Sequence, residues 1–326
     1  MKTYKKSLIL ALVCFVIVTV LNFFLPRLLP GNPIAYLTGF SEEDMTPAQI
    51  AYYRQALHLE EPVFIQFGYY LRSLFDGTLG YSYKKEAAVF ALILERLGYT
   101  LQITLPAVIL STTIGLFWGL HCGYKKGSLC DKASTTLQIV VNTMPAFLIA
   151  MVLMILLCFR QNWFPYTGLN SAQVLPGTAA YLLDRIHHLI LPVLTLTIAS
   201  TPSRYLLMRN TVSQITDEKY VLYAKERGLS DMKIKFGYIL KNIAQPFVTM
   251  VGMSVSTCIG GSLVVENVFS IGGMGQLLSE AVYTLDYPLM QGILFVTTAI
   301  MTISIVLTDL ICILIDPKVR LGGGET

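Results

Sequence analysis

Charged residues are scarce in this chain of 326 residues. Aspartate, glutamate, lysine and arginine make up 13% of the sequence, hydrophobic residues make up 54%, and the mean hydropathy is +0.60. An ordinary soluble domain has about 25% charged residues, so the composition predicts an integral membrane protein. The net charge of +4 lies in short segments between apolar runs, which favours a membrane explanation over nucleic-acid binding.

Motifs of catalysis and metal binding are also missing. The sequence contains no G-x-x-x-x-G-K-[ST] phosphate loop, no H-E-x-x-H zinc motif and no G-x-S-x-G nucleophile elbow. It has only four histidines, and its six cysteines form no C-x-x-C pair. Most of these cysteines stand in apolar runs, as small core residues do. Nothing here supports a membrane protease or a self-powered pump, and no catalytic, cofactor or metal site is predicted on this chain.

What the sequence does contain is a set of long uncharged intervals. Six of them approach the roughly 17–25 residues that a membrane-spanning helix needs. They lie between residues 6 and 27, 96 and 125, 132 and 160, 185 and 204, 241 and 266, and 286 and 309. The first interval is followed by no small-x-small cleavage site, so we interpret it as a retained anchor rather than a signal peptide.

Lysines and arginines in the connecting segments predict the orientation. With the N-terminus inside, the inner segments hold 16 of these residues and the outer segments hold 8. The cytoplasmic side normally carries the excess. We therefore expect both termini in the cytoplasm of a multi-pass protein of the cell membrane.

The most polar long segment is residues 212–246. It reads as two short helices joined at Gly228, because glycine readily takes the left-handed conformation that ends a helix. Ser230 is expected to cap the second helix, and Asp231 suits its positive end. The periodicity predicts that these apolar residues face inward: Ile215, Tyr220, Ala224, Ile234, Tyr238 and Ile239. Periodicity alone fits an amphipathic hairpin on the membrane surface equally well.

The order of residues in this segment is more specific. Residues 220–229, YVLYAKERGL, followed by Asn242 and Pro246, resemble the cytoplasmic coupling loop of ABC importer permeases, and especially the dipeptide, oligopeptide and nickel branch. Leu222 and Tyr223 depart from that pattern, since glutamate and alanine are usual at these positions. In this family the loop inserts a short helix into a cleft on the ATPase subunit.

Further blocks extend the resemblance over nearly the whole chain. They are PGNP at residues 30–33, GTLGYS at 77–82, the run 261–275 that ends in GGMG, DYP at 286–288, and DPKVR at 316–320. Glycines 260 and 261 also suggest close helix packing.

The resemblance implies an all-α polytopic membrane protein. We expect six transmembrane helices of the type I ABC importer permease kind, with a small extracytoplasmic helical subdomain after the first helix. The expected units are an anchor at residues 1–25, the subdomain at 26–98, and a core at 99–326 with its coupling loop at 209–245. In the subdomain, Thr46 and Pro47 predict a helix start. The subdomain is either a structural cap or a contact for a substrate-binding protein.

The function implied is that of the transmembrane permease subunit of an ATP-driven importer. The solute is expected to be a peptide or a nickel or metal-chelate compound. Expected partners are a second homologous permease, two ABC ATPase subunits that bind ATP and magnesium, an extracytoplasmic binding protein and membrane lipid. Neither the solute nor the identity of the second permease follows from this sequence.

Candidate coupling residues follow from the resemblance, and candidate pathway residues follow from their position within or beside the apolar intervals. Those expected to couple to the ATPase are Tyr220, Ala224, Arg227, Gly228, Leu229 and Ser230. Candidates for lining or gating the pathway are Asn142, Thr143, Met144 and Glu266. Asn142, Thr143 and Met144 stand beside Pro145, where helix–helix contacts are favoured over a pathway role. For Glu266, expected at the outer interface, a structural role is favoured.

Other ionisable residues have open roles. His187 and His188 invite a metal-site interpretation, but no third ligand is nearby and an interfacial role is favoured. Asp309 and Glu266 are the acids nearest the hydrocarbon, where a proton relay is one alternative to a structural role. An ion-coupled transporter or channel is the competing function, and it calls for a convincing relay and usually internal repeats, neither of which is evident.

Overall fold

The computed structural model describes residues 2–28, 34, 44–56, 58–257 and 262–315. Within these ranges the chain is largely helical, with one two-stranded antiparallel ladder. Three of the features noted in the sequence, residues 30–33, 260–261 and 316–320, lie outside the described residues.

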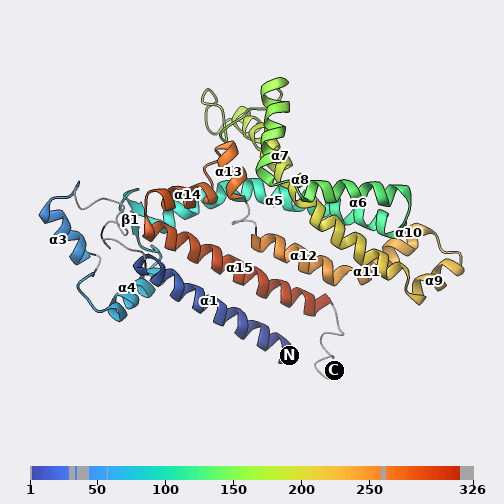
Figure 1. The fold of residues 1–326 in the computed structure, drawn as a ribbon, viewed down its shortest axis with the longest axis horizontal. Helices are drawn as coiled ribbons and strands as arrows, with labels where there is room; N and C mark the ends of the chain where they lie inside the picture. Colours follow the sequence, from blue (N-terminus) through green and yellow to red (C-terminus); the bar gives the residue numbers. More distant parts are fainter. Residues whose placement is uncertain (1, 29–33, 35–43, 57, 258–261, 316–326) are drawn as a thin grey trace.

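Long helices packed side by side form the elongated body of the molecule (Figure 1). Helix α5 packs along α8, α12 packs along α15, and α15 in turn contacts α1. These helices are α1 (Lys2–Leu28), α5 (Val89–Tyr124), α8 (Ala179–Thr216), α12 (Ala244–Thr257) and α15 (Tyr287–Ile315).

The third predicted span is sharply bent rather than straight. Helix α6 (Leu129–Asn142) and the segment formed by α7 (Ala146–Leu153) and the π-helical η2 (Met154–Arg160) meet at 98°. Pro145 lies at this break in an extended conformation. A proline disfavours the helical conformation of the residue before it and lacks an N–H, so it ends α6 here. Pro106 lies inside the continuous α5 and causes no such break.

The number of full-length spans differs from the six expected. Among the described residues, three helices are long and apolar enough to cross a membrane: α5, α8 and residues Pro288–Ile315 of α15. The bent α6–α7 pair gives a fourth if it counts as one span. The apolar part of α1, Leu8–Phe24, and the 14-residue α12 are shorter. Each of these helices, among the described residues, overlaps one of the charge-free intervals, but the intervals did not reveal the break at Pro145.

One end of the body carries the small elements that follow α1. They are α3 (Pro47–Ala56), α4 (Val63–Phe75), β1 (Tyr81–Ser82) and β2 (Ala87–Ala88). Thr46 caps α3 as predicted: its hydroxyl accepts from the Gln49 N–H at 3.3 Å, and Gln49 Oε1 accepts from the Thr46 N–H at 2.8 Å. Helix α5 begins at Val89, so it crosses the boundary expected at residue 98; the division into units stays a prediction.

The opposite end carries the polar segment. After α8 come α9 (Lys219–Glu226), α10 (Asp231–Ile234), the π-helical η3 (Lys235–Ile239) and α11 (Leu240–Asn242). The start of α1 and the end of α15 lie toward this same end (Figure 1). Two further helices, α13 (Leu263–Phe269) and α14 (Met274–Tyr283), connect α12 to α15.

Three hydrophobic clusters follow one another along α5. The first joins α5 to α4, α14 and α15 and includes Val89 and Ile93. The second, around Ile103 and Ala107, joins α5 to α7, α8 and α13. The third includes Leu120 and joins α5 to α8 and to the polar segment. Helix α5 therefore contributes residues to all three of these clusters.

The α5–α8 contact depends on glycines. Gly115, Gly119 and Gly123 share one face of α5, and a Cβ built on any of them would lie 2.6–2.8 Å from an atom of α8. Real Cβ atoms do not approach that closely. Small residues at four-residue spacing allow membrane helices to pack backbone to backbone, so this spacing in the sequence is a signal for the contact.

We predict that Gly119→Ala destabilises the protein. The added methyl group would lie 2.7 Å from the Met208 Cβ and 2.9 Å from the Arg209 N, and such overpacking costs about 1–3 kcal/mol. Thermal unfolding of the purified protein in detergent measures the effect. Gly98→Ala is the matched control on the same helix, because no atom lies within 4 Å of its Cβ position. Equal melting temperatures for the two variants would contradict the packing argument.

Candidate functional site

Helix α9 is held by a narrow buried face and exposes the rest of its surface. Val221 is fully buried and Ala224 is 3% exposed, whereas Tyr223 is 61% exposed. Leu222 and Tyr220 are also exposed. The prediction that Tyr220 lies on the inward face was wrong, because Val221, one position further along, occupies that face. Partial burial, with a smaller contribution from Glu218, raises the pKa of Tyr220.

The end of α9 is a hydrogen-bonded helix cap built on Gly228. Gly228 has φ +71°, the left-handed conformation expected for it. Its N–H donates to the Lys225 carbonyl at 2.8 Å, and the Leu229 N–H donates to the Ala224 carbonyl at 3.2 Å. Leu229 is half-buried against the same cluster as Ala224. This pair of bonds and this apolar contact are the features of a Schellman motif, so the turn after α9 has a defined shape.

Two other coupling candidates occupy the turn. Arg227 stands at the C-cap of α9 and is exposed. Ser230 stands at the N-cap of α10 with an extended backbone, but its hydroxyl makes no capping bond, contrary to expectation. Asp231, in the first turn of α10, instead accepts a hydrogen bond from another helix.

That bond ties the polar segment to the end of α5. The Tyr124 hydroxyl donates to Asp231 Oδ1 at 2.7 Å. Lys225 Nζ and Lys235 Nζ lie 5.1 and 4.7 Å from the centre of the Tyr124 ring, within the range of cation–π attraction. In the same polar segment Ile234 and Ile239 are fully buried, as predicted. Helices α5, α9 and α10 are therefore fastened to one another.

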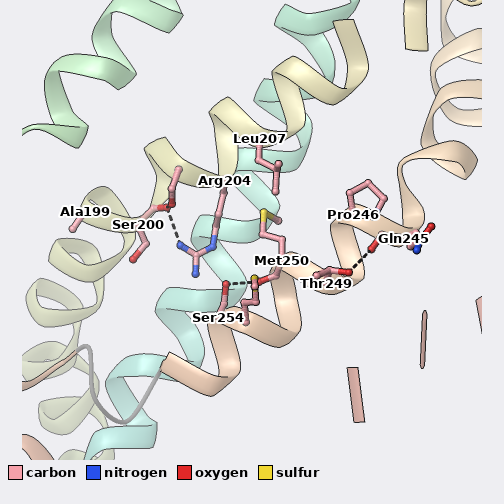
Figure 2. A pocket seen from close by; sticks show the side chains of 11 residues that line it. Ala199, Ser200, Arg204, Leu207, Gln245, Pro246, Thr249, Met250 and Ser254 are labelled. Atoms are coloured by element: carbon pink, nitrogen blue, oxygen red, sulfur yellow. Dashed lines mark hydrogen bonds between the residues drawn. The ribbon is translucent and has the colours of Figure 1, made fainter. Parts of the chain in front are cut away.

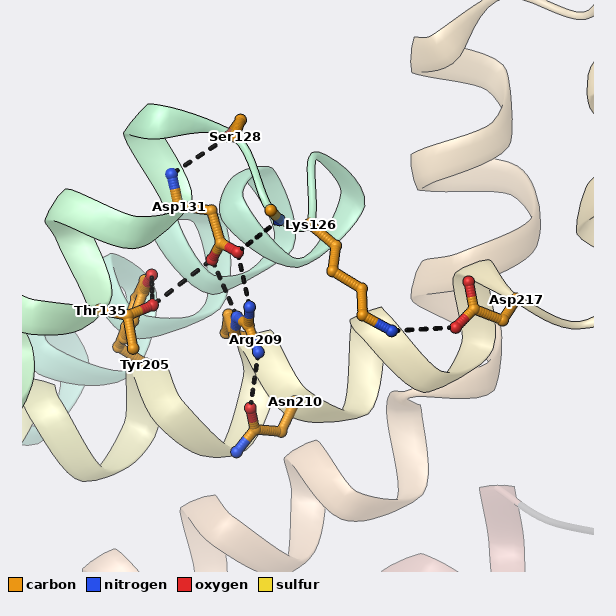
Figure 3. A network of polar contacts seen from close by, with 9 residues as sticks. Lys126, Ser128, Asp131, Thr135, Tyr205, Arg209, Asn210 and Asp217 are labelled. Atoms are coloured by element: carbon orange, nitrogen blue, oxygen red, sulfur yellow. Dashed lines mark hydrogen bonds and ion pairs between the residues drawn. The ribbon is translucent and has the colours of Figure 1, made fainter.

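A second polar network joins α6 to α8 (Figure 3). Arg209 donates twice to Asp131, from Nε to Oδ1 at 2.8 Å and from Nη2 to Oδ2 at 2.5 Å. Asp131 is 1% exposed, and its carboxylate also accepts from the Gly127 N–H at 2.9 Å. A two-pronged arginine–carboxylate pair is directional as well as strong. It fixes the part of α8 that leads into α9.

The candidates for lining the pathway at the bend between α6 and α7 lie away from the coupling candidates. Asn142, Thr143 and Met144 are exposed at the α6–α7 junction, which is far from α9 in Figure 1. The Thr143 hydroxyl donates to the Val140 carbonyl of its own helix at 2.7 Å. The structure therefore does not bring these residues together with the coupling candidates, and their role stays a prediction.

Glu266 is fully buried and enclosed by donors. Oε1 accepts from the hydroxyls of Thr100 and Ser262, each at 2.7 Å. Oε2 accepts from the N–H groups of Gly275 at 2.8 Å and Gln276 at 3.3 Å, in the first turn of α14. A carboxylate at a helix N-terminus with four donors is satisfied in place. This geometry favours a structural link between α5, α13 and α14 over a pathway-lining role.

The histidine pair contacts backbone. His187 Nε2 lies 2.8 Å from the Trp163 carbonyl oxygen, and His188 Nδ1 lies 2.8 Å from the Asp184 carbonyl oxygen. Asp309 is half-buried in α15. Within the described ranges, no three His, Cys, Asp or Glu side chains gather as a metal site would need.

Comparison with known proteins identifies the family. The profile described as "binding-protein-dependent transport system inner membrane component" matches residues 111–321, and the profile of the N-terminal part of such components matches residues 2–104. The chain belongs to this family. It is thus a permease component of a binding-protein-dependent importer, which implies ATPase and binding-protein partners and a membrane location.

Individual relatives match over nearly their whole length. The chain is 30% identical to a probable peptide ABC transporter permease, y4tP, of Sinorhizobium fredii, over 97% of this chain and 98% of that protein. It is 28% identical to the dipeptide permease DppB of Escherichia coli K12, over 97% of each. The inward-facing MetNI methionine ABC transporter has a chain of similar fold, with a TM-score of 0.55 and 16% identity over 69% of this chain and 96% of that one. The fold is therefore that of a type I ABC importer permease.

We predict that Arg209→Leu strongly destabilises the protein. The substitution leaves the Asp131 carboxylate buried without its cation, which costs about 3–5 kcal/mol. Lys126→Leu is the control, because it breaks the exposed Lys126–Asp217 pair, which is worth at most about 1 kcal/mol. Thermal unfolding in detergent compares the two variants. If both lose the same stability, the Asp131–Arg209 pair is not the anchor described here.

We also predict that Glu266→Gln lowers stability by about 1–3 kcal/mol, because an amide group cannot accept from all four donors. Glu280→Gln is the matched control, since Glu280 lies on α14 in an exposed pair with Lys85. Unfolding temperatures report the difference. A Glu266→Gln protein of normal stability that fails in transport would instead favour the pathway role.

Proposed function

We propose that this chain is the membrane-spanning subunit of an ATP-driven importer of short peptides. The observation that carries the proposal is the form of α9: a rigidly capped helix that buries only Val221 and Ala224 and exposes Leu222 and Tyr223. Exposed apolar and aromatic side chains on a rigid protrusion suit a partner's cleft. The names of the relatives in Sinorhizobium and Escherichia support peptides as the solute.

The proposed assembly contains a second homologous permease, two ABC ATPase subunits and an extracytoplasmic binding protein. ATP and magnesium bind to the ATPases, and this chain itself catalyses no reaction. The coupling site comprises Tyr220, Ala224, Arg227, Gly228, Leu229 and Ser230. The buried Ala224, together with the neighbouring Val221 outside this set, holds the helix in place, while the exposed face enters the ATPase cleft.

Movement of α9 reaches the membrane helices through the contacts described above. The Tyr124–Asp231 hydrogen bond and the cation–π contacts transmit it to α5. The short turn between Thr216 and Lys219 transmits it to α8. Closure of the ATPase dimer would then shift the helix bundle between outward-open and inward-open states.

The proposed orientation places α9 in the cytoplasm. The lysine-rich segments around α9 and before α6 lie toward the same end as the start of α1, and cytoplasmic loops carry such an excess. The elements α3, α4 and the β1–β2 ladder then face the binding protein.

We predict that Tyr223→Asp reduces recovery of the ATPase subunits with the affinity-purified permease by about tenfold, because a buried carboxylate without a partner weakens an apolar contact. Tyr223 is 61% exposed, so the permease itself should fold normally. Tyr283→Asp is the control: this tyrosine is 87% exposed at the opposite end, at the close of α14. Densitometry of the co-purified subunits is the measurement.

Two results would count against the proposal. One is normal ATPase recovery with Tyr223→Asp, which would move the docking site away from α9. The other is a native permease that never recruits an ATPase and transports solute in response to an ion gradient, which would favour the ion-coupled alternative.

A further inference from the structure

A cavity of about 870 Å³ opens between α8 and α12. Figure 2 shows the α8 side chains on one wall and the α12 side chains on the other. The lining residues are Ala199, Ser200, Ser203, Arg204, Leu207, Gln245, Pro246, Thr249, Met250, Met253 and Ser254. Among these, Arg204 alone carries a formal charge. None of them was a site candidate from the sequence.

The Arg204 side chain is held in a defined position. Its Nε donates to the Thr112 hydroxyl of α5 at 3.2 Å, and its Nη1 donates to the Ser200 carbonyl oxygen at 2.8 Å. Gly115 lets the backbone of α8 approach at this level, since a Cβ there would lie 2.7 Å from the Arg204 Cβ. Arg204 is 8% exposed, and Figure 2 shows its guanidinium reaching from α8 toward Met250 and Ser254.

Hydroxyl groups on both walls have their protons engaged. Ser203 donates to the Ser200 carbonyl at 3.1 Å, Thr249 to the Gln245 carbonyl at 3.1 Å, and Ser254 to the Met250 carbonyl at 2.7 Å. A hydroxyl that donates its proton along its own helix still has lone pairs to accept from a ligand. The cavity therefore combines a cation with several acceptors, next to the apolar side chains of Leu207 and Met253.

Such a surface matches the chemistry of a short peptide. A free carboxylate is the natural ligand of a positioned guanidinium, and peptide N–H groups donate to hydroxyl oxygens. A membrane protein keeps an arginine in a cavity at a cost, which usually marks a solute pathway.

We propose that this cavity forms part of the solute pathway and that Arg204 binds the free carboxylate of the passing peptide. The inference rests on the proposed function of peptide import. It adds the residue and the chemical group by which this subunit recognises its solute. The alternative is that Arg204 only braces α5 against α8, with no ligand.

The first test measures the charge in the cavity without requiring transport. Met253 is 64% exposed and lines the cavity, so a Met253→Cys variant is open to methanethiosulfonate reagents. The intact transporter in zwitterionic nanodiscs is treated with the anionic sulfonatoethyl and the cationic trimethylammonioethyl reagent, and the rates of the chain without this cysteine are subtracted.

We expect the anionic reagent to react faster, relative to its rate with a free thiol, by about tenfold. Arg204→Gln should abolish this preference and Arg204→Lys should keep it. Equal relative rates in the native-arginine background would overturn the proposal, and so would a preference that survives Arg204→Gln.

The second test uses import of radiolabelled dialanine by the complete transporter in liposomes, normalised to assembled complex. Arg204→Gln should lower the import rate about tenfold, since a charge-assisted hydrogen bond is lost, and Arg204→Lys should restore much of it. The binding protein is a separate chain, so delivery is unchanged. Equal import by the glutamine and lysine variants overturns the carboxylate role. Absence of dialanine import by the native transporter contradicts the proposed function instead, while the thiol test still reports on the cavity.

Discussion

At Gly115, Gly119 and Gly123 the backbone of α8 comes so close to α5 that no methyl group fits between the two helices. Most of the functional geometry described above depends on this contact. It sets the level at which Arg204 meets Thr112, and it brings the end of α5 beside the polar segment that follows α8. Lipid gives helices no hydrophobic reason to associate, so close backbone packing of this kind has to hold them together.

The proposed coupling role requires α9 to be rigid and yet mostly exposed, and α9 meets both requirements with few residues. Val221 and Ala224 provide its buried face, while the Gly228 cap and the Tyr124–Asp231 hydrogen bond fix its end. The Asp131–Arg209 pair fixes the adjoining part of α8. A force applied to α9 therefore acts on two fixed helices, α5 and α8, rather than on a flexible loop.

The family, the polar segment and most of the capping and turn signals were predictable from the sequence, because capping and turn chemistry depend on nearby residues. The cap predicted at Ser230 is an exception, since its hydroxyl makes no capping bond. Thr46, Pro47 and Gly228 behave as their types dictate. Prediction from the sequence failed where partners are distant in the chain. Asp131 and Arg209 are 78 residues apart, and Thr100 and Glu266 are 166 apart, so neither partnership has a local signature. The choice of Tyr220 over Val221 failed because a short helix tolerates a shift of one position in its apparent face.

Among the described residues, the buried charges fall into two kinds, which differ in whether their surroundings can change. Glu266 and Asp131 are enclosed by hydroxyl, backbone N–H and guanidinium donors of the protein itself, so their surroundings stay the same as long as the fold does. Arg204 borders a cavity of about 870 Å³, and its electrostatic energy depends on whether water, a partner side chain or a solute anion fills that space. Only a charge of the second kind can respond to the passage of a solute, because its environment changes while its anchoring bonds to Thr112 and Ser200 remain.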